Sequence, residues 1–315
     1  MRQARHILGI GLAALASLSF AGCASQQQGS DFWMDHLVFV SSRSGANDIY
    51  ISDMQGRNIR QLTNDATDDA TPRIAIDGRI VFSSRRTGTW QLYSMDWDGS
   101  DLKALTSEPA VNNYRPFPAP DGRIVFISDR FLKPHVFSMN PDGSDVRRLT
   151  FGSVYNDYPV VGDDGHIYFT SSRSSKWEIW KMGPDGSMPT QLTSSTKNIK
   201  EIALVSPTYP DKDARFTNRT TMLPTFGFYT QPRIVFSASS SEGGNFGIYR
   251  INRDGSDLRE LTANQMFLNR SPVMWPNGRI LFTSDRSGST DIWSMSPDGR
   301  DPRQVIADPA YDSTS

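Results

Sequence analysis

The sequence predicts an all-β protein, a six-bladed β-propeller built from four-stranded antiparallel blades. Three observations predict it: six similar segments cover the chain, each contains short apolar runs, and turn signals separate the runs. The glycines of one recurrent turn lie 43 or 44 residues apart, except for one interval of 69. A period in the low forties made of short strands is typical of propeller blades. These glycines are Gly56, Gly99, Gly143, Gly186, Gly255 and Gly299.

The longest apolar run of each segment is predicted to be the second strand of its blade. An unbroken apolar run indicates burial on both faces, and a blade is covered on both faces by its two neighbours. The six runs are residues 37–40, 80–82, 124–127, 167–169, 234–236 and 280–282.

Two turns per segment predict the remaining strands. An Asp-Gly or Asn-Gly pair before the apolar run predicts a tight two-residue turn, and hence a first strand before that turn. A later turn such as Asn140-Pro141-Asp142-Gly143 predicts a type I turn followed by a left-handed glycine, and this second kind of hairpin leads to the fourth strand. The first strands are expected at residues 73–76, 114–118, 158–161, 201–205 and 271–275.

Closure of the ring is expected to depend on the N-terminal side of the repeats. Residues 31–34 stand where the first strand of blade 1 should be, and the tail 308–315 ends before a comparable strand would begin. We therefore expect blade 1 to use consecutive N-terminal strands, with side-chain packing between blades 1 and 6 closing the ring.

The N-terminus predicts export. Two arginines precede the 14-residue apolar run 7–20, which is too short to span a bilayer, and small residues follow. The ending Phe20-Ala21-Gly22-Cys23 resembles a bacterial lipobox, which implies a signal peptide at residues 1–22 and lipid attachment to Cys23. Ordinary secretion with a spare cysteine is the alternative. Residues 23–30 are expected to be a flexible tether, and residues 31–315 the propeller.

The repeat pattern resembles that of the TolB-like propeller family. It combines Ser-Asp-Arg-x-Gly, Asp-Ile-Tyr or Asp-Ile-Trp, Pro-Asp-Gly-x-Asp and Leu-Thr over residues 32 to about 306. The resemblance implies a six-bladed periplasmic propeller that binds protein, as one member binds a peptidoglycan-associated lipoprotein. Similar repeats accompany prolyl oligopeptidase-type enzymes and some lyases, so the resemblance leaves activity open. The family's additional N-terminal α/β domain is absent, and a lipid anchor is expected instead.

The chemistry-bearing residues predict no catalytic centre. The 33 basic and 34 acidic residues nearly balance, which is unlike a nucleic-acid-binding surface. Neither a metal-binding histidine pair nor a nucleophile elbow is present. We expect His36, His135 and His166 to be structural, and Asp96–Asp101 to be a blade turn rather than a calcium loop. Neither a metal nor a cofactor is expected, and the protein is not expected to be an enzyme.

Five arginines that end the second strands are candidates for a ligand-facing ring. A ring of guanidinium groups could bind an acidic peptide or a carboxylate ligand. The alternative is a structural role, in which these arginines pair with Asp48, Glu178 and Asp291 at the start of the third strands. The five are Arg43, Arg85, Arg130, Arg173 and Arg286.

The long interval carries an insertion, residues 206–231, that replaces the first turn of blade 5. Loops of this length are usually functional or disordered, and its aromatic residues argue against disorder. It is expected to be a partner-binding loop or a lid over its own blade, on the face opposite the arginines. Its candidate contact residues are Tyr209, Phe216, Phe226, Phe228 and Tyr229.

These features together predict a monomeric cell-envelope lipoprotein, anchored by lipid in the outer membrane, that acts as a non-catalytic scaffold for an envelope protein or peptide. The alternatives are a periplasmic enzyme or accessory domain acting on peptide or glycan, and a sugar-binding propeller.

Overall fold

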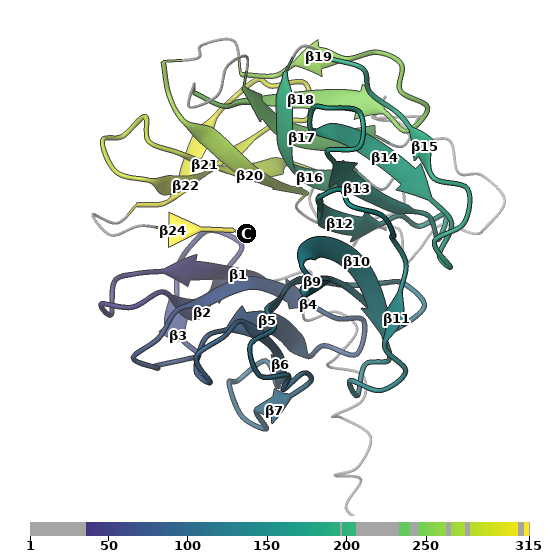
Figure 1. Cartoon of the computed structure of the whole chain (residues 1–315). Coiled ribbons are helices and arrows are strands. Elements are labelled where there is room, and N and C mark those ends of the chain that lie inside the picture. Colours follow the sequence, from purple (N-terminus) through teal and green to yellow (C-terminus); the bar gives the residue numbers. More distant parts are fainter. Residues whose placement is uncertain are drawn as a thin grey trace, which may run out of the picture.

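The computed structural model describes residues 36–195, 197–205, 233–239, 245–262, 266–274, 278–307 and 312–314. Within these ranges the chain forms six four-stranded antiparallel sheets, arranged around a central axis (Figure 1). The predicted six-bladed propeller is confirmed. The same ranges contain no helix with the length and apolar character that a membrane span requires.

Each blade consists of an innermost strand A, then B and C, and an outermost strand D. The A strands are β24 (Asp312–Ser313), β4 (Asp69–Ile74), β8 (Asn113–Pro118), β12 (Asn156–Val161), β16 (Asn198–Val205) and β20 (Asn269–Met274). The B strands are β1 (His36–Ser41), β5 (Ile80–Ser84), β9 (Ile124–Phe131), β13 (Ile167–Ser171), β17 (Arg233–Ser239) and β21 (Ile280–Ser284).

Strands C and D complete the blades in the same order. The C strands are β2 (Asp48–Asp53), β6 (Gln91–Met95), β10 (Lys133–Met139), β14 (Glu178–Met182), β18 (Gly247–Asn252) and β22 (Asp291–Met295). The D strands are β3 (Arg60–Gln61), β7 (Lys103–Ala104), β11 (Arg147–Arg148), β15 (Thr190–Gln191), β19 (Arg259–Glu260) and β23 (Arg303–Ile306). All six predicted apolar runs lie within the B strands.

The core lies between blades. Phe82 and Met95 of blade 2, for example, are fully buried against Ile49 and Ile51 of blade 1. Burial of both sheet faces by neighbouring blades explains why the B strands are continuously apolar instead of alternating.

The A strands are bulged at a shared sequence feature. Register shifts of β4 against β5 and of β8 against β9 fall next to Pro72 and Pro116, after the left-handed residues Thr71 and Arg115. A proline is tolerated there because the bulge requires no ladder N–H. In blade 2 the strand begins at Asp69, four residues before the predicted start, because the bulge hides the period-two pattern.

The two hairpins of a blade use the same turn, so the prediction of two different turns is wrong. Gly78 donates to the Ala75 carbonyl between strands A and B, and Gly56 donates to the Asp53 carbonyl between strands C and D. Both glycines have positive φ, 87° and 71°, while Asp77 does not. The Asp-Gly pair is therefore the end of a type I turn with a left-handed glycine, not a two-residue loop.

The glycines of the C–D turns also lie against the backbone of the preceding blade. A Cβ atom on Gly143 would lie 2.4 Å from the Leu105 carbonyl oxygen of blade 2, and one on Gly56 would lie 2.2 Å from the Val305 oxygen of blade 6. Only a residue without a side chain permits this approach. The A–B turn glycine Gly122 has no atom within 4 Å of such a Cβ.

The ring is closed by the C-terminal tail, which corrects the expected closure. β24 pairs with β1 through Val40 with Ser313 and Ser41 with Asp312, so it occupies the strand A position of blade 1. Figure 1 shows this last strand beside the first one, near the centre of the ring. Backbone hydrogen bonding across the two ends of the chain therefore joins them, rather than side-chain packing alone. Residues 31–34 lie outside the described residues.

Candidate functional site

The strand directions divide the propeller into two faces. The A–B and C–D turns lie on one face, here called the turn face. The B–C and D–A connections lie on the other, here called the loop face. The insertion joins β16 to β17, which pair through Val205 and Arg233 at the turn face. Residues 206–231, and with them Tyr209, Phe216, Phe226, Phe228 and Tyr229, lie outside the described residues, as does Cys23.

The candidate arginines lie at the loop face and are held by their own blades. Arg43 donates from Nε to Ser41 (2.8 Å) and from Nη2 to Asp312 (3.1 Å). In blade 6 Arg286 donates in the same way to Ser284 and to Asn269, at 2.9 Å each. The partner in strand A is its first residue, which is fully buried in both blades. Arg130 and Arg173 repeat the arrangement with Asn113 and Asn156.

In blade 2 this position belongs to Arg86, not to the predicted Arg85. Arg86 donates to Ser84 and to Asp69, as the equivalent arginines do. Arg85 is exposed, and its guanidinium lies 5.8 Å from the centroid of the Trp90 ring. Arg85 and Arg86 are adjacent in the sequence, so either could be aligned with the arginines of the other blades.

The carboxylates named as alternative partners have other roles. Asp48 accepts hydrogen bonds from Thr63 and Gln61, Glu178 from Thr193, and Asp291 from Gln304. The pairing of the arginines with these three acids was therefore wrong. The threonine of the Leu-Thr motif also accepts the N–H of the second residue of strand C, as in Ile49 to Thr63 (2.9 Å). This contact explains why Leu-Thr ends so many repeats.

Each guanidinium also lies over an aromatic ring of strand C, and all but that of Arg130 lie over a ring of strand B as well. Arg86 is 4.7 Å from the Tyr93 centroid, and Arg173 is 4.6 Å from that of Trp180. Cation–π stacking and two fixed hydrogen bonds brace the B–C connection against the blade. This geometry favours the structural alternative over a ligand-facing ring.

The histidines are dispersed, and His135 is part of the core. It is fully buried at the start of β10, with Nδ1 3.2 Å from Thr150 Oγ1 and Nε2 2.9 Å from Arg148 Nη2. Burial, together with Arg148 and Arg173, lowers its pKa to about 4. In this environment the His135 imidazole is neutral, and its Nε2 accepts a hydrogen bond from Arg148. His166, in the A–B turn of blade 4, lies 3.2 Å from Asp164.

The stretch Asp96–Asp101 forms the C–D turn of blade 2. Gly99 donates to the Asp96 carbonyl, and Ser100 donates to the Asp98 side chain. No group of three His, Cys, Asp or Glu side chains suited to a metal ion occurs among the described residues.

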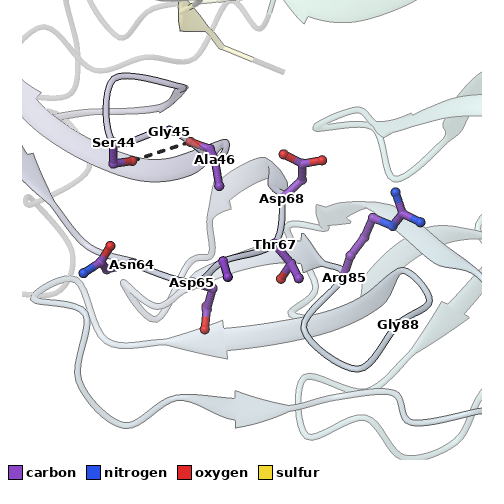
Figure 2. A pocket seen from close by; sticks show the side chains of 10 residues that line it. Ser44, Gly45, Ala46, Asn64, Asp65, Thr67, Asp68, Arg85 and Gly88 are labelled. Carbon is purple, nitrogen blue, oxygen red and sulfur yellow. Dashed lines mark hydrogen bonds between the residues drawn. The ribbon is translucent and has the colours of Figure 1, made fainter.

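A polar hollow of about 760 Å³ lies on the loop face between blades 1 and 2. Figure 2 shows Asp65, Asp68 and Arg85 around it. Asp65 is paired with Arg86 at 2.7 Å, and Asp68 accepts from the Asn47 N–H at 3.2 Å. These carboxylates therefore serve the junction between the two blades.

Titratable groups also meet on the inner strands of blades 3 and 4. Arg115 binds both oxygens of Asp157, at 2.9 and 3.0 Å, and donates to the Tyr158 hydroxyl at 2.8 Å. Burial raises the pKa of Asp157, which Arg115 opposes, and burial with nearby Glu201 raises the pKa of Tyr158. Glu201 itself accepts from Ser237. These groups are committed to one another, so the cluster offers no ready general base.

The loop face of blades 3 to 5 exposes an aromatic and basic surface that the sequence reasoning did not identify. Leu132 is 96% exposed at the tip of the β9–β10 hairpin, next to Phe131 at 51%, and Phe151 of the following D–A connection is 66% exposed. We call the whole set the cationic–aromatic surface; it comprises Phe131, Leu132, Phe151, Tyr155 and Trp177 with Lys133, Arg148, Lys176 and Lys200.

One signal of this surface was present in the sequence. Where other blades continue Ser-x-Arg with a short polar turn, blade 3 has Phe131-Leu132-Lys133-Pro134. The pairing of Lys133 with Phe131 extends the two strands into a longer hairpin that carries the apolar tip.

The comparisons with known proteins agree with the architecture. The TolB beta propeller domain model matches residues 33–123, which run from the first strand of the chain through strand A of blade 3. No curated protein matches the chain at the sequence level.

Three similar solved structures illustrate the range of proteins that share the fold. TolB from Acinetobacter baumannii has a TM-score of 0.67 at 16% identity, with 90% of this chain and 66% of that chain covered. Kuenenia stuttgartiensis hydrazine synthase has a TM-score of 0.71 at 17% identity, with 89% and 46% covered. An oligogalacturonate lyase in complex with manganese has a TM-score of 0.53 at 14% identity, with 86% and 87% covered.

This chain therefore spans about two thirds of that TolB and about half of the hydrazine synthase. Identities this low show a common fold and leave function open. The chain is thus a six-bladed β-propeller, and its residues 33–123 match the TolB beta propeller domain model.

Proposed function

We propose that the protein is a cell-envelope scaffold whose propeller binds a protein or peptide without catalysing a reaction. The observation that carries this proposal is the cationic–aromatic surface, where Leu132, Phe131 and Phe151 expose apolar groups on one face. Exposed aromatic clusters on a rigid body are typical of protein contacts. The likeness to TolB and its family model supports binding in the envelope, and the propeller acts as a monomer.

The rival function is that of an enzyme acting on peptide or glycan. The structural likeness to an oligogalacturonate lyase is the reason to consider it. The ion-pair cluster around Arg115 and Asp157 is its best candidate centre. Both carboxylate oxygens of Asp157 accept from Arg115, and the pKa of Tyr158 is raised, which disfavours its use as a base. The geometry therefore supports the scaffold better.

Lipid attachment at Cys23 is part of the proposal, supported by the apolar run before it and the small residues beside it. Replacing Cys23 with Ser should release the protein from the membrane fraction and remove the mass of the acyl chains. Fractionation and intact-mass measurement check both. Membrane association with an unshifted mass in the variant would show that lipidation is not the anchor.

The scaffold proposal is tested by capture from envelope extracts with the wild-type chain as bait. A defined set of envelope proteins should be retained, and the purified protein should not cleave peptide or glycan substrates. A second bait lacks residues 206–231. Loss of partners from this bait would assign the insertion a binding role, and unchanged partners would exclude it. Capture of no protein by either bait, or turnover of a substrate, would contradict the proposal.

A further inference from the structure

The cationic–aromatic surface alternates rings and cations across three blades. Arg148 lies between two rings, 4.2 Å from the Phe131 centroid and 4.9 Å from that of Phe151. Lys133 lies 3.9 Å from the Tyr155 centroid and donates to the Tyr155 hydroxyl. The rings are thus held in place before any partner arrives, which reduces the entropy lost on binding.

The row continues into blades 4 and 5. Tyr155 lies 6.4 Å from Trp177, centroid to centroid, and Lys200 lies 4.8 Å from the Trp177 ring. Lys176 is exposed beside Trp177. Rings and cations therefore extend from the β9–β10 hairpin to strand β16.

Arg148 is prepared for a carboxylate. Its Nε donates to the Thr150 carbonyl at 2.7 Å, and its Nη2 contacts His135 at 2.9 Å. Within the described ranges Nη1 makes no hydrogen bond to the protein. A guanidinium fixed in a plane can still donate from Nη1 to one oxygen of a carboxylate, as a charge-assisted hydrogen bond.

The charge on these loops is one-sided. Two carboxylates lie nearby and are turned toward their own connections: Asp129 accepts from Asn112, and Glu178 accepts from the Ser195 N–H. The four cations of the surface, Lys133, Arg148, Lys176 and Lys200, outnumber these two acids. Charge complementarity therefore favours an acidic occupant, and Leu132 and Phe151 favour one with apolar side chains.

We propose that the cationic–aromatic surface docks an acidic segment of a partner protein, with carboxylates on Arg148 and the lysines and apolar side chains on Leu132 and Phe151. This inference rests on the proposed function and names the surface and the chemistry of the partner. A protein segment is favoured over an anionic membrane because β1 enters the propeller at the opposite, turn face. The proposed lipid anchor at Cys23 would thus join the propeller at the face opposite this surface.

Three soluble fluorescent peptides test the chemistry by anisotropy with the full propeller. The first is rich in Glu with one Leu and one Phe; the second has Lys in place of Glu; the third has Ser in place of Leu and Phe. The first should bind, and the other two should bind at least about tenfold more weakly. Raising NaCl from about 50 to about 500 mM should weaken binding, because the attraction is partly ionic.

Two variants locate the site. Leu132→Ser with Phe151→Ser should weaken binding of the first peptide by about tenfold or more. The matched control is Met188→Ser with Ile76→Ser, which removes apolar groups of similar exposure, 82% and 66%, from the turn face. Since all four side chains are exposed, both variants should fold. Equal binding of the Glu and Lys peptides, or equal effects of the two variants, would overturn the inference.

Vesicles of phosphatidylcholine and phosphatidylglycerol test the membrane as occupant. Sedimentation of the soluble propeller with these vesicles, lost in the Leu132/Phe151 variant, together with no peptide binding, would overturn the inference in favour of lipid. Envelope capture separates the two proposals. If capture is undiminished in the Leu132/Phe151 variant, the scaffold stands and this docking surface does not. If the wild type captures nothing, the scaffold itself fails.

Discussion

Single polar residues at the loop face brace the blades in a way that recurs around the ring. An arginine after strand B reaches the first residue of strand A, while the first residue of strand C holds the threonine of Leu-Thr. Asp48, Gln91 and Glu178 hold that threonine from the first residue of strand C, and His135 holds it from the third residue of β10. In blade 6, which lacks Leu-Thr, Asp291 accepts from Gln304 instead. One location therefore accepts several chemistries. His135 is the member whose charge changes in the weakly acidic range.

Stability should therefore depend on pH through His135. Its pKa is about 4 in the folded protein and 6.5 in an ordinary environment, so the unfolded chain binds a proton first as pH falls. The loss of folding free energy begins near pH 6.5 and is complete near pH 4, reaching about 3 kcal/mol. Urea unfolding at pH 7 and pH 4.5 measures it.

His135→Gln is the matched variant, because Gln91 occupies the equivalent place in blade 2 and accepts from Thr106 at 2.7 Å. The carboxylates that also titrate in this range are common to both proteins. The wild type should therefore lose more stability than the variant on acidification. Parallel losses would show that His135 is not responsible.

At the scale of elements, both hairpins of a blade share a turn but differ in what surrounds it. The C–D turn presses its glycine on the backbone of the neighbouring blade, whereas the A–B turn stands clear. The same Asp-Gly pair occurs in both turns. It indicates a glycine with positive φ, but it does not indicate whether that glycine contacts another blade. Turn positions were therefore predictable, and turn type and contacts were not.

Gly143→Ala should destabilise the fold far more than Gly122→Ala. Both substitutions place a side chain at positive φ, 86° and 87°, which costs about 1–2 kcal/mol. Only at Gly143 does the new Cβ meet a carbonyl oxygen, at 2.4 Å, adding about 1–3 kcal/mol. Chemical denaturation of the two variants compares them. Similar unfolding midpoints would mean that the backbone at Leu105 can shift to admit the new Cβ without a loss of stability.

On the scale of the whole molecule, the repeats made the number of blades and most strands predictable. They did not predict how β24 closes the ring against β1. The strand A pattern of an Asp or Asn followed three residues later by Pro is present at Asp69 and Asn113. The tail has Asp312-Ser313-Thr314 without that proline, so it did not resemble a strand. The cationic–aromatic surface was missed for a related reason: loop aromatics carry no period that distinguishes exposure from burial.

Deleting residues 311–315 should open the ring and lower the unfolding midpoint. The deletion removes the pairing of β24 with β1, the ion pair of Arg43 with buried Asp312, and the Thr314 hydroxyl bond to the Ser271 carbonyl at 2.9 Å. Thermal unfolding measures the loss.

Asp312→Asn is the control for that deletion. Asparagine stands at the equivalent position of blades 3 and 4, where Asn113 and Asn156 accept from Arg130 and Arg173. The substitution should therefore lower the midpoint much less than the deletion. A deletion as mild as the substitution would mean that β24 contributes little to closure.

The double pairing of β1 also has a mechanical consequence. β1 is bonded to β2 on one edge and to β24 on the other. A pull on the chain before His36 acts along the strand axis, so the bonds on both edges are sheared together instead of opening one after another. Tension on the chain before His36 is thus shared between the first blade and the last strand of the chain. In an open ring β1 would be an edge strand and would detach first under tension. In the closed ring it is bonded on both edges.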